Sequence, residues 1–157
     1  MIKNIPTTYK DVTYRSRLEA RWAVFFDELK IKHIYEYEGF ILENKEYYLP
    51  DFYLPQYDVY CEVKPNFEEV FLNQNTFVNF AKTNNWLLIL SSLPNVNTTL
   101  LYRYNETINV IPFANIIKEN YGTFWYSGYK LGSNEDCFLE YNYFRKAVNV
   151  AEKYNFY

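Results

Sequence analysis

Cysteine, histidine and glycine are rare in this chain, and each rarity excludes a class of site. The two cysteines, Cys61 and Cys137, are too few for a disulfide framework or a cysteine-ligated zinc site. His33 is the only histidine, which weighs against histidine-metal nucleases and against Ser-His or Cys-His triads. With 4 glycines in the chain and no Gly-rich phosphate loop, we expect neither an NTPase nor a nucleotide cofactor.

Long apolar runs and an excess of positive charge are also absent. No stretch approaches the ~18–20 apolar residues of a membrane span, so no membrane partner is expected. The first residues lack the apolar run of a signal peptide, which predicts a cytoplasmic protein. The net charge of −3 argues mildly against a large phosphate-binding surface. Cations do gather near the start of the chain, at Lys3, Lys10, Arg15, Arg17 and Arg21.

Aromatic residues are abundant, at 22% of the chain, and hydrophobic residues reach 49%. A chain of 157 residues with this composition predicts one globular domain with a sizeable core. We predict a single α/β domain over residues 1–157, with a core at about 14–92 and an aromatic-rich C-terminal extension at about 98–157.

Hydrophobic periodicity predicts the order of elements in this domain. An apolar stripe at three- and four-residue steps predicts a first helix from Ser16 to Lys30. The wholly apolar run Trp86–Leu90 predicts a strand covered on both faces, joined to an earlier strand by a βαβ-type crossover. The other expected elements are strands at 33–38, 40–42, 47–49, 100–104, 108–111 and 124–129, and helices at about 66–84, 113–120 and 138–154.

The segments Tyr48–Leu54 and Val59–Lys64 are expected to form a β-hairpin with one apolar face. If they pair about a centre between Gln56 and Tyr57, Phe52 faces Cys61 and Asp51 faces Glu62. Two carboxylates so placed repel each other, and a divalent cation would convert the repulsion into coordination. The predicted apolar face holds Pro50, Phe52, Leu54, Val59, Cys61 and Val63, and the other face holds Asp51, Tyr53, Tyr60, Glu62 and Lys64.

A plainer interpretation of the same pattern stays open. An amphipathic hairpin with one solvated face also shows charged residues at alternate positions. A loop of odd length would shift the register by one residue and separate Asp51 from Glu62. Glu19, at the margin of the helix stripe, could be a surface charge that leans inward. Arg15, Arg17 and Arg21 are either a solvated flank or phosphate contacts.

Taken together, these segments resemble the PD-(D/E)xK nuclease superfamily. Pro50-Asp51 and Glu62-Val63-Lys64 form the two halves of its signature, and the helix with Glu19 precedes them in the expected order. Residues 15–23, the 35–39 strand and the Tyr-Leu-Pro-Asp spelling look like a subset of these nucleases, many of them encoded by phages. The resemblance covers about residues 14–92 and implies a restriction-endonuclease-like α-β-β-β-α-β core with a mixed sheet.

The resemblance also implies a set of metal ligands. Asp51 and Glu62 would bind Mg²⁺, or Mn²⁺ in its place, with the Val63 carbonyl and waters completing the shell. Glu19 would add a ligand or hold a metal-bound water. Lys64 would position the attacking water and stabilise the transition state, although its plainer role is a salt-bridge partner.

Two further residue roles follow from the same resemblance. Gln74 corresponds to a glutamine that orients the site in some exonuclease-like relatives. Arg15, Arg17 and Arg21 would contact DNA from the first helix.

The expected function is therefore a Mg²⁺-dependent endonuclease that hydrolyses DNA phosphodiester bonds in branched or specific duplex DNA. RNA and exonucleolytic action stay open, and a homodimer is compatible with junction or sequence-specific cleavage. The resemblance places such a protein in the cytoplasm of a bacterial or phage-infected cell. The alternatives are a non-catalytic DNA- or protein-binding module that keeps the nuclease fold, and an inhibitor or host-interaction protein that uses an acidic, aromatic surface.

Overall fold

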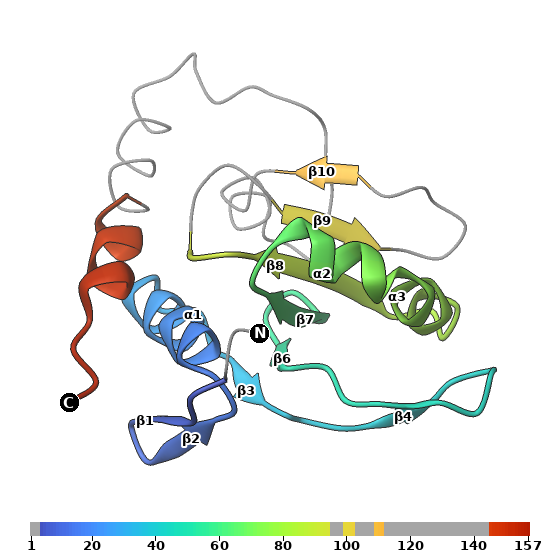
Figure 1. Cartoon of the computed structure of the whole chain (residues 1–157), viewed down its shortest axis with the longest axis horizontal. Coiled ribbons are helices and arrows are strands. Elements are labelled where there is room, and N and C mark those ends of the chain that lie inside the picture. The colour runs from blue at the N-terminus through green and yellow to red at the C-terminus, as the bar shows by residue number, and fades with distance from the viewer. Residues whose placement is uncertain (1–3, 95–98, 103–108, 112–144) are drawn as a thin grey trace.

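The computed structural model describes residues 4–94, 99–102, 109–111 and 145–157 of a mixed α/β protein (Figure 1). Within these residues, six strands form one sheet in the order β10-β9-β8-β7-β6-β3. Among the described strands of this sheet, only the β7–β8 pair is parallel, so the sheet is mixed, as predicted. Its strands are β3 (Ile34–Tyr35), β6 (Phe52–Leu54), β7 (Val59–Lys64), β8 (Trp86–Ser91), β9 (Thr99–Tyr102) and β10 (Asn109–Ile111).

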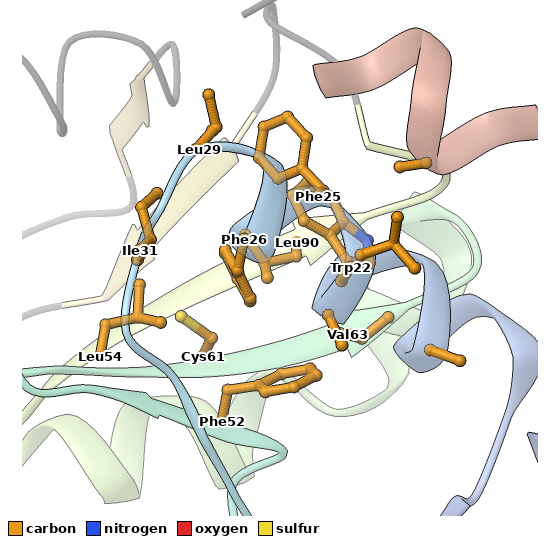
Figure 2. Close-up of a cluster of buried hydrophobic side chains, with 14 of the residues drawn as sticks. Trp22, Phe25, Phe26, Leu29, Ile31, Phe52, Leu54, Cys61, Val63 and Leu90 are labelled. Atoms are coloured by element: carbon orange, nitrogen blue, oxygen red, sulfur yellow. The ribbon is translucent and has the colours of Figure 1, made fainter. Parts of the chain in front are cut away.

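The predicted first helix is confirmed as α1 (Arg17–Glu28). Ser16 caps its N-terminus, where the hydroxyl accepts a hydrogen bond from the Glu19 N–H at 3.1 Å. Its aromatic side chains Trp22, Phe25 and Phe26 are fully buried against the sheet, as Figure 2 shows. They form the first core cluster with one face of β6, β7 and β8 and with Ala147 and Ala151.

The hairpin of β6 and β7 has the predicted register. Phe52 pairs with Cys61 and Leu54 with Val59. The predicted apolar face is also confirmed, because Phe52, Leu54, Val59, Cys61 and Val63 all belong to the first core cluster and Pro50 is buried. Asp58 in the connecting turn has a φ of 50°, a left-handed conformation that aspartate tolerates better than most residues.

The opposite face of the hairpin is covered, so the solvated-face interpretation is wrong. It packs against two short helices, α2 (Phe67–Leu72) and α3 (Gln74–Ala81), and against β4 (Phe40–Ile41) and β5 (Tyr47–Tyr48). The apolar side chains of these elements cover the second face of the sheet and exclude water from it. The buried residues form the second core cluster, Leu42, Tyr48, Tyr60, Val70, Phe77, Phe80, Ala81, Leu87 and Ile89.

The single helix predicted at about 66–84 is wrong, because the chain forms two helices with a break at Asn73. Asn66 caps α2 as expected, accepting from the Glu69 N–H at 2.9 Å. Asn73 has φ −104° and ψ 6°, and its side chain donates to the Glu69 carbonyl at 2.7 Å. An asparagine side chain that bonds to nearby backbone competes with the helical ladder, which explains the interruption.

The predicted crossover is confirmed, since β8 runs parallel to β7 along its whole length. The pairing extends from Val59 opposite Trp86 to Lys64 opposite Ser91. The Ser92 N–H then donates to the Lys64 carbonyl at 2.7 Å. Residues 87–90 are completely buried, as a strand covered on both faces requires.

Three N-terminal features differ from or add to the prediction. The strand expected at 33–38 ends at Tyr35, because Glu36 takes a left-handed φ of 47°. The arms around residues 43–46 do pair, but β4 and β5 form a separate two-stranded sheet. A hairpin of β1 (Thr7–Tyr9) and β2 (Val12–Tyr14) was not expected, and its turn places Lys10 and Asp11 at φ 45° and 65°.

The described part of the C-terminal region agrees with the prediction. β9 and β10 pair antiparallel, and residues 145–153 are helical within the helix expected at 138–154. The helix expected at 113–120, the strand at 124–129 and Cys137 lie outside the described residues. Among the residues described, no helix is long and apolar enough to cross a membrane.

Candidate functional site

A pocket of about 540 Å³ lies where the N-terminus of α1, the end of β7 and the start of α2 meet. It contains all four residues predicted to be catalytic, which come from separate parts of the chain. α1 supplies Glu19, the residue before β6 is Asp51, and β7 supplies Glu62 and Lys64. The other lining residues are Asn4, Ile5, Arg15, Ser16, Arg17, Leu18, Val63, Pro65, Asn66 and Glu69.

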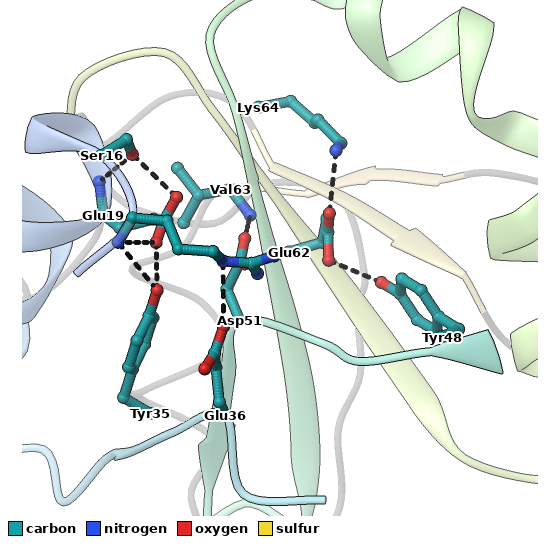
Figure 3. Close-up of polar contacts among 10 residues, drawn as sticks. Ser16, Glu19, Tyr35, Glu36, Tyr48, Asp51, Glu62, Val63 and Lys64 are labelled. Carbon is teal, nitrogen blue, oxygen red and sulfur yellow. Dashed lines mark hydrogen bonds and ion pairs between the residues drawn. The ribbon is translucent and has the colours of Figure 1, made fainter. Parts of the chain in front are cut away.

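Asp51, the residue before β6, is held in place by two strong hydrogen bonds (Figure 3). Its Oδ2 accepts from the Val63 N–H at 2.7 Å, and its Oδ1 accepts from Arg15 Nη2 at 2.7 Å. The residue is 3% exposed. Burial, followed by the nearby charges of Glu62 and Glu19, raises the pKa of Asp51 well above its usual value. A cation in the pocket would therefore stabilise the ionised form of this side chain.

Glu62 lies between a cation and a hydroxyl group. Lys64 Nζ is 2.8 Å from its Oε1, and the Tyr48 hydroxyl donates to its Oε2 at 2.7 Å. Both donors belong to strands, and Lys64 Nζ also lies 5.9 Å from the centroid of the Phe77 ring. A buried carboxylate with a donor on each oxygen has a fixed orientation.

Glu19 is 7% exposed and fully hydrogen-bonded, so the interpretation as a surface charge is wrong. Its Oε2 accepts from the Tyr35 hydroxyl at 2.6 Å and from the Arg15 N–H at 3.2 Å. Its Oε1 accepts from the Ser16 hydroxyl at 2.8 Å. Because Ser16 also caps α1, the helix terminus and this carboxylate hold each other in place.

The three arginines of the first helix region have three different environments. Arg15 bridges two carboxylates, with Nε 2.9 Å from Glu36 Oε1 and Nη2 on Asp51. Arg17 lines the pocket, and its guanidinium contacts the hydroxyl and ring of Tyr157. Arg21 Nη1 instead donates to the carbonyls of residues 151 and 152 at 2.7 and 2.6 Å. Their predicted DNA contacts stay predictions.

Gln74 does not lie with these residues. It is exposed at the first position of α3 and does not line the pocket. The predicted orienting role of Gln74 has no contact to support it in this arrangement.

The expected salt-bridge role of Lys64 is confirmed by its contact with Glu62, but the other partners of the carboxylates were missed in the sequence. Ser16 and Glu19 have the spacing of a capping box, a signal that could have revealed their contact. Tyr35 and Tyr48 belong to segments that carry the family resemblance, but that resemblance gave them no role. Their contacts depend on how the distant strands β3 and β5 are placed. Aromatic residues are also so common here that composition does not single out two of them.

The pocket offers carboxylate oxygens, which are hard donors, but they are not grouped as the ligands of a preformed metal site among the described residues. Among the described residues, no three Asp, Glu, His or Cys side chains are grouped closely enough to hold a metal ion. Asp51 and Glu62 remain two carboxylates on one pocket wall, each with an internal cation beside it. Arg17 and Lys64 line the same pocket, so it presents both carboxylates, which could contact a cation, and cationic groups, which could contact a phosphate.

No family model matches the chain, and no curated protein matches its sequence at a significant level. The residues that line the pocket and their contacts are therefore the basis on which a function can be proposed.

Proposed function

We propose that this protein is a Mg²⁺-dependent nuclease that hydrolyses phosphodiester bonds in DNA, with Mn²⁺ able to replace Mg²⁺. The observation that carries the proposal is the presence of Glu19, Asp51, Glu62 and Lys64 in one pocket, although three separate segments supply them. Carboxylates are the ligands that Mg²⁺ takes in proteins, and a lysine can stabilise charge on a phosphate, so this set of residues suits metal-assisted phosphodiester hydrolysis.

The proposal includes a restriction-endonuclease-like core. In its support, a helix bearing Glu19 precedes the hairpin strands β6 and β7, and a helical crossover leads from β7 to the parallel strand β8. The pocket opens at the end of β7 where Glu62, Val63 and Lys64 follow one another.

The donor set suits Mg²⁺ without a third carboxylate. Proteins commonly bind Mg²⁺ through one or two carboxylates and leave several waters on the ion. Asp51 and Glu62 would be those ligands, with the Val63 carbonyl and Glu19 as further oxygen donors. Burial, followed by the nearby charges of Glu62 and Glu19, raises the pKa of Asp51, and a bound cation would favour its ionised form. When bound, the ion would acidify a water and offset charge on the scissile phosphate.

The chain's own cations have separate roles in this proposal. Lys64, 2.8 Å from Glu62, would orient the attacking water and stabilise negative charge that develops on the phosphate oxygens. The ion pair suits an electrostatic role better than a role as base. Arg17, on the pocket wall, would contact a neighbouring backbone phosphate and hold the DNA in register.

The test is cleavage of labelled duplex, single-stranded and four-way-junction DNA, with an RNA hairpin alongside, in Mg²⁺ or in EDTA. We expect Mg²⁺-dependent cleavage of at least one DNA. Lys64→Ala should reduce the rate by about 10²–10³, the usual cost of losing one preorganised electrostatic contact. Lys82→Ala is the matched control, because Lys82 pairs with Glu43 and does not line the pocket. Absence of cleavage, or equal rates for Lys64→Ala and the wild type, would contradict the proposal.

One observation favours the alternative of a non-catalytic binding module. Arg15 and Lys64 already neutralise Asp51 and Glu62, so the described site is satisfied without a metal. Calorimetric titration with Mn²⁺ separates the two functions. Binding that is lost in Asp51→Ala supports the nuclease, whereas no binding favours the module.

A further inference from the structure

We propose that Tyr48 is a positioning residue that fixes the orientation of Glu62 as a metal ligand. This inference rests on the proposed function. Tyr48 lies in β5, outside the predicted signature, and its hydroxyl donates to Glu62 Oε2 at 2.7 Å (Figure 3). Lys64 holds the other oxygen at 2.8 Å, so the carboxylate is fixed from two directions.

The Tyr48 ring is packed tightly enough to fix the direction of its hydroxyl group. The residue is 8% exposed and belongs to the second core cluster. Its ring meets Phe80 edge-on, with centroids 5.2 Å apart at 69°, and lies 6.4 Å from Phe77. Phe77 is also the ring beside Lys64 Nζ. Helix α3 therefore supports both donors that bind Glu62.

The Tyr48 contact restricts Glu62 without using up its capacity to bind a metal. An ionised carboxylate has about four lone-pair sites, and the two hydrogen bonds occupy one on each oxygen. Without the hydroxyl, Lys64 alone would hold Glu62, and the carboxylate could rotate about its last torsion. The lone pairs left for a cation would then have no fixed direction.

Tyr48 acts through Glu62 and not on the substrate. Glu62 lines the pocket, whereas Tyr48 does not. Outer partners of this kind, which orient a ligand, typically change metal affinity by about 10–100-fold when removed. The adjacent Tyr47 is 63% exposed, which makes it a matched control for the loss of one tyrosine hydroxyl.

The experiment compares Tyr48→Phe and Tyr47→Phe in the full chain, with Mn²⁺ titrated by calorimetry and cleavage followed by steady-state kinetics. Tyr48→Phe should weaken Mn²⁺ binding by about 10–100-fold and lower kcat, while KM for DNA stays unchanged. Tyr47→Phe should match the wild type in all three quantities. Melting in EDTA reports whether each variant is folded.

The outcomes separate this inference from the proposed function. Wild-type Mn²⁺ affinity in folded Tyr48→Phe overturns the role of Tyr48 and leaves the nuclease proposal standing. A wild-type protein that neither binds Mn²⁺ nor cuts DNA overturns both. If Tyr48→Phe does not fold, Phe80→Leu decides, because it loosens the ring support and keeps the hydroxyl. Weaker Mn²⁺ binding by that variant supports the inference, and unchanged binding overturns it.

Discussion

Arg15 binds the carboxylate that a metal ion would need. Its guanidinium contacts Asp51 Oδ1 at 2.7 Å while the Arg15 side chain remains 56% exposed. Water would solvate the released guanidinium, and a bound cation would replace it in balancing the charge of the buried Asp51. If the proposed function holds, Arg15 and a divalent cation would compete for Asp51, and cation binding would release the guanidinium toward DNA phosphates.

This competition predicts opposite effects on two measurements. Arg15→Gln should raise Mn²⁺ affinity about tenfold or more, since a unit charge at ~4 Å contributes up to about 4 kcal/mol near a protein surface. The same variant should cut DNA more slowly, because a phosphate contact is lost. Calorimetry and cleavage assays measure the two effects. Lys82→Gln is the control, because Lys82 pairs with Glu43 outside the pocket, and unchanged or weaker Mn²⁺ binding in Arg15→Gln would refute the competition.

The central residues of the pocket could be predicted from the sequence, but their partners could not. Alternation along two strands was sufficient to place Asp51, Glu62 and Lys64 on one side of a hairpin. The burial of Glu19 was not evident from its position at the margin of a stripe. It depends on Tyr35, a residue of β3 that reaches the helix terminus through the tertiary fold. Such tertiary contacts cannot be inferred from the spacing of residues in the sequence.

Among the elements, those set by hydrophobic periodicity were predicted well. The hairpin register followed from its apolar face, because a shift of one residue would have exposed that face. The hairpin of β1 and β2 was missed, and two other failures come from single residues that interrupt a regular pattern. Asn73 divides a helix and Glu36 ends a strand, and each does so through a backbone conformation or side-chain bond that competes with the ladder.

One arginine of α1 contacts the C-terminal end of the helix at residues 145–153. Arg21 donates to the carbonyls of residues 151 and 152, groups that have no partner inside the helix that they end. A cation there also complements the negative end of the helix dipole. Ala147 and Ala151 pack in the first core cluster, so this contact joins the C-terminal helix to the core beside the site.

We therefore expect Arg21→Ala to loosen the C-terminal helix. The free energy of unfolding should fall by about 1–2 kcal/mol, the usual value of charged hydrogen bonds at a helix terminus. Amide hydrogen exchange should accelerate in residues 145–153 before the rest of the chain. Lys153→Ala removes an exposed cation from the same helix and should change stability by less than about 0.5 kcal/mol. Equal exchange in the two variants would rule out a capping role for Arg21.

Burial on both faces distinguishes the whole molecule from a simple amphipathic sheet. The first core cluster anchors α1 with Glu19, and the second anchors α3 with the aromatic rings that support Tyr48. The pocket lies at the end of β7, between these two layers. The geometry of the site therefore depends on the packing of both core clusters, and a substitution in either cluster can disturb it.

A substitution in the second core cluster should show that this face supports the fold. Phe80 is completely buried and meets the rings of Phe40, Tyr48 and Tyr60 at 5.0–5.5 Å. Phe80→Ala should reduce the free energy of unfolding by about 3–5 kcal/mol, the cost of emptying a packed aromatic site. Phe71→Ala on α2 is the control, because Phe71 is 66% exposed. Chemical denaturation measures both, and similar small losses would mean that the second face is solvated after all.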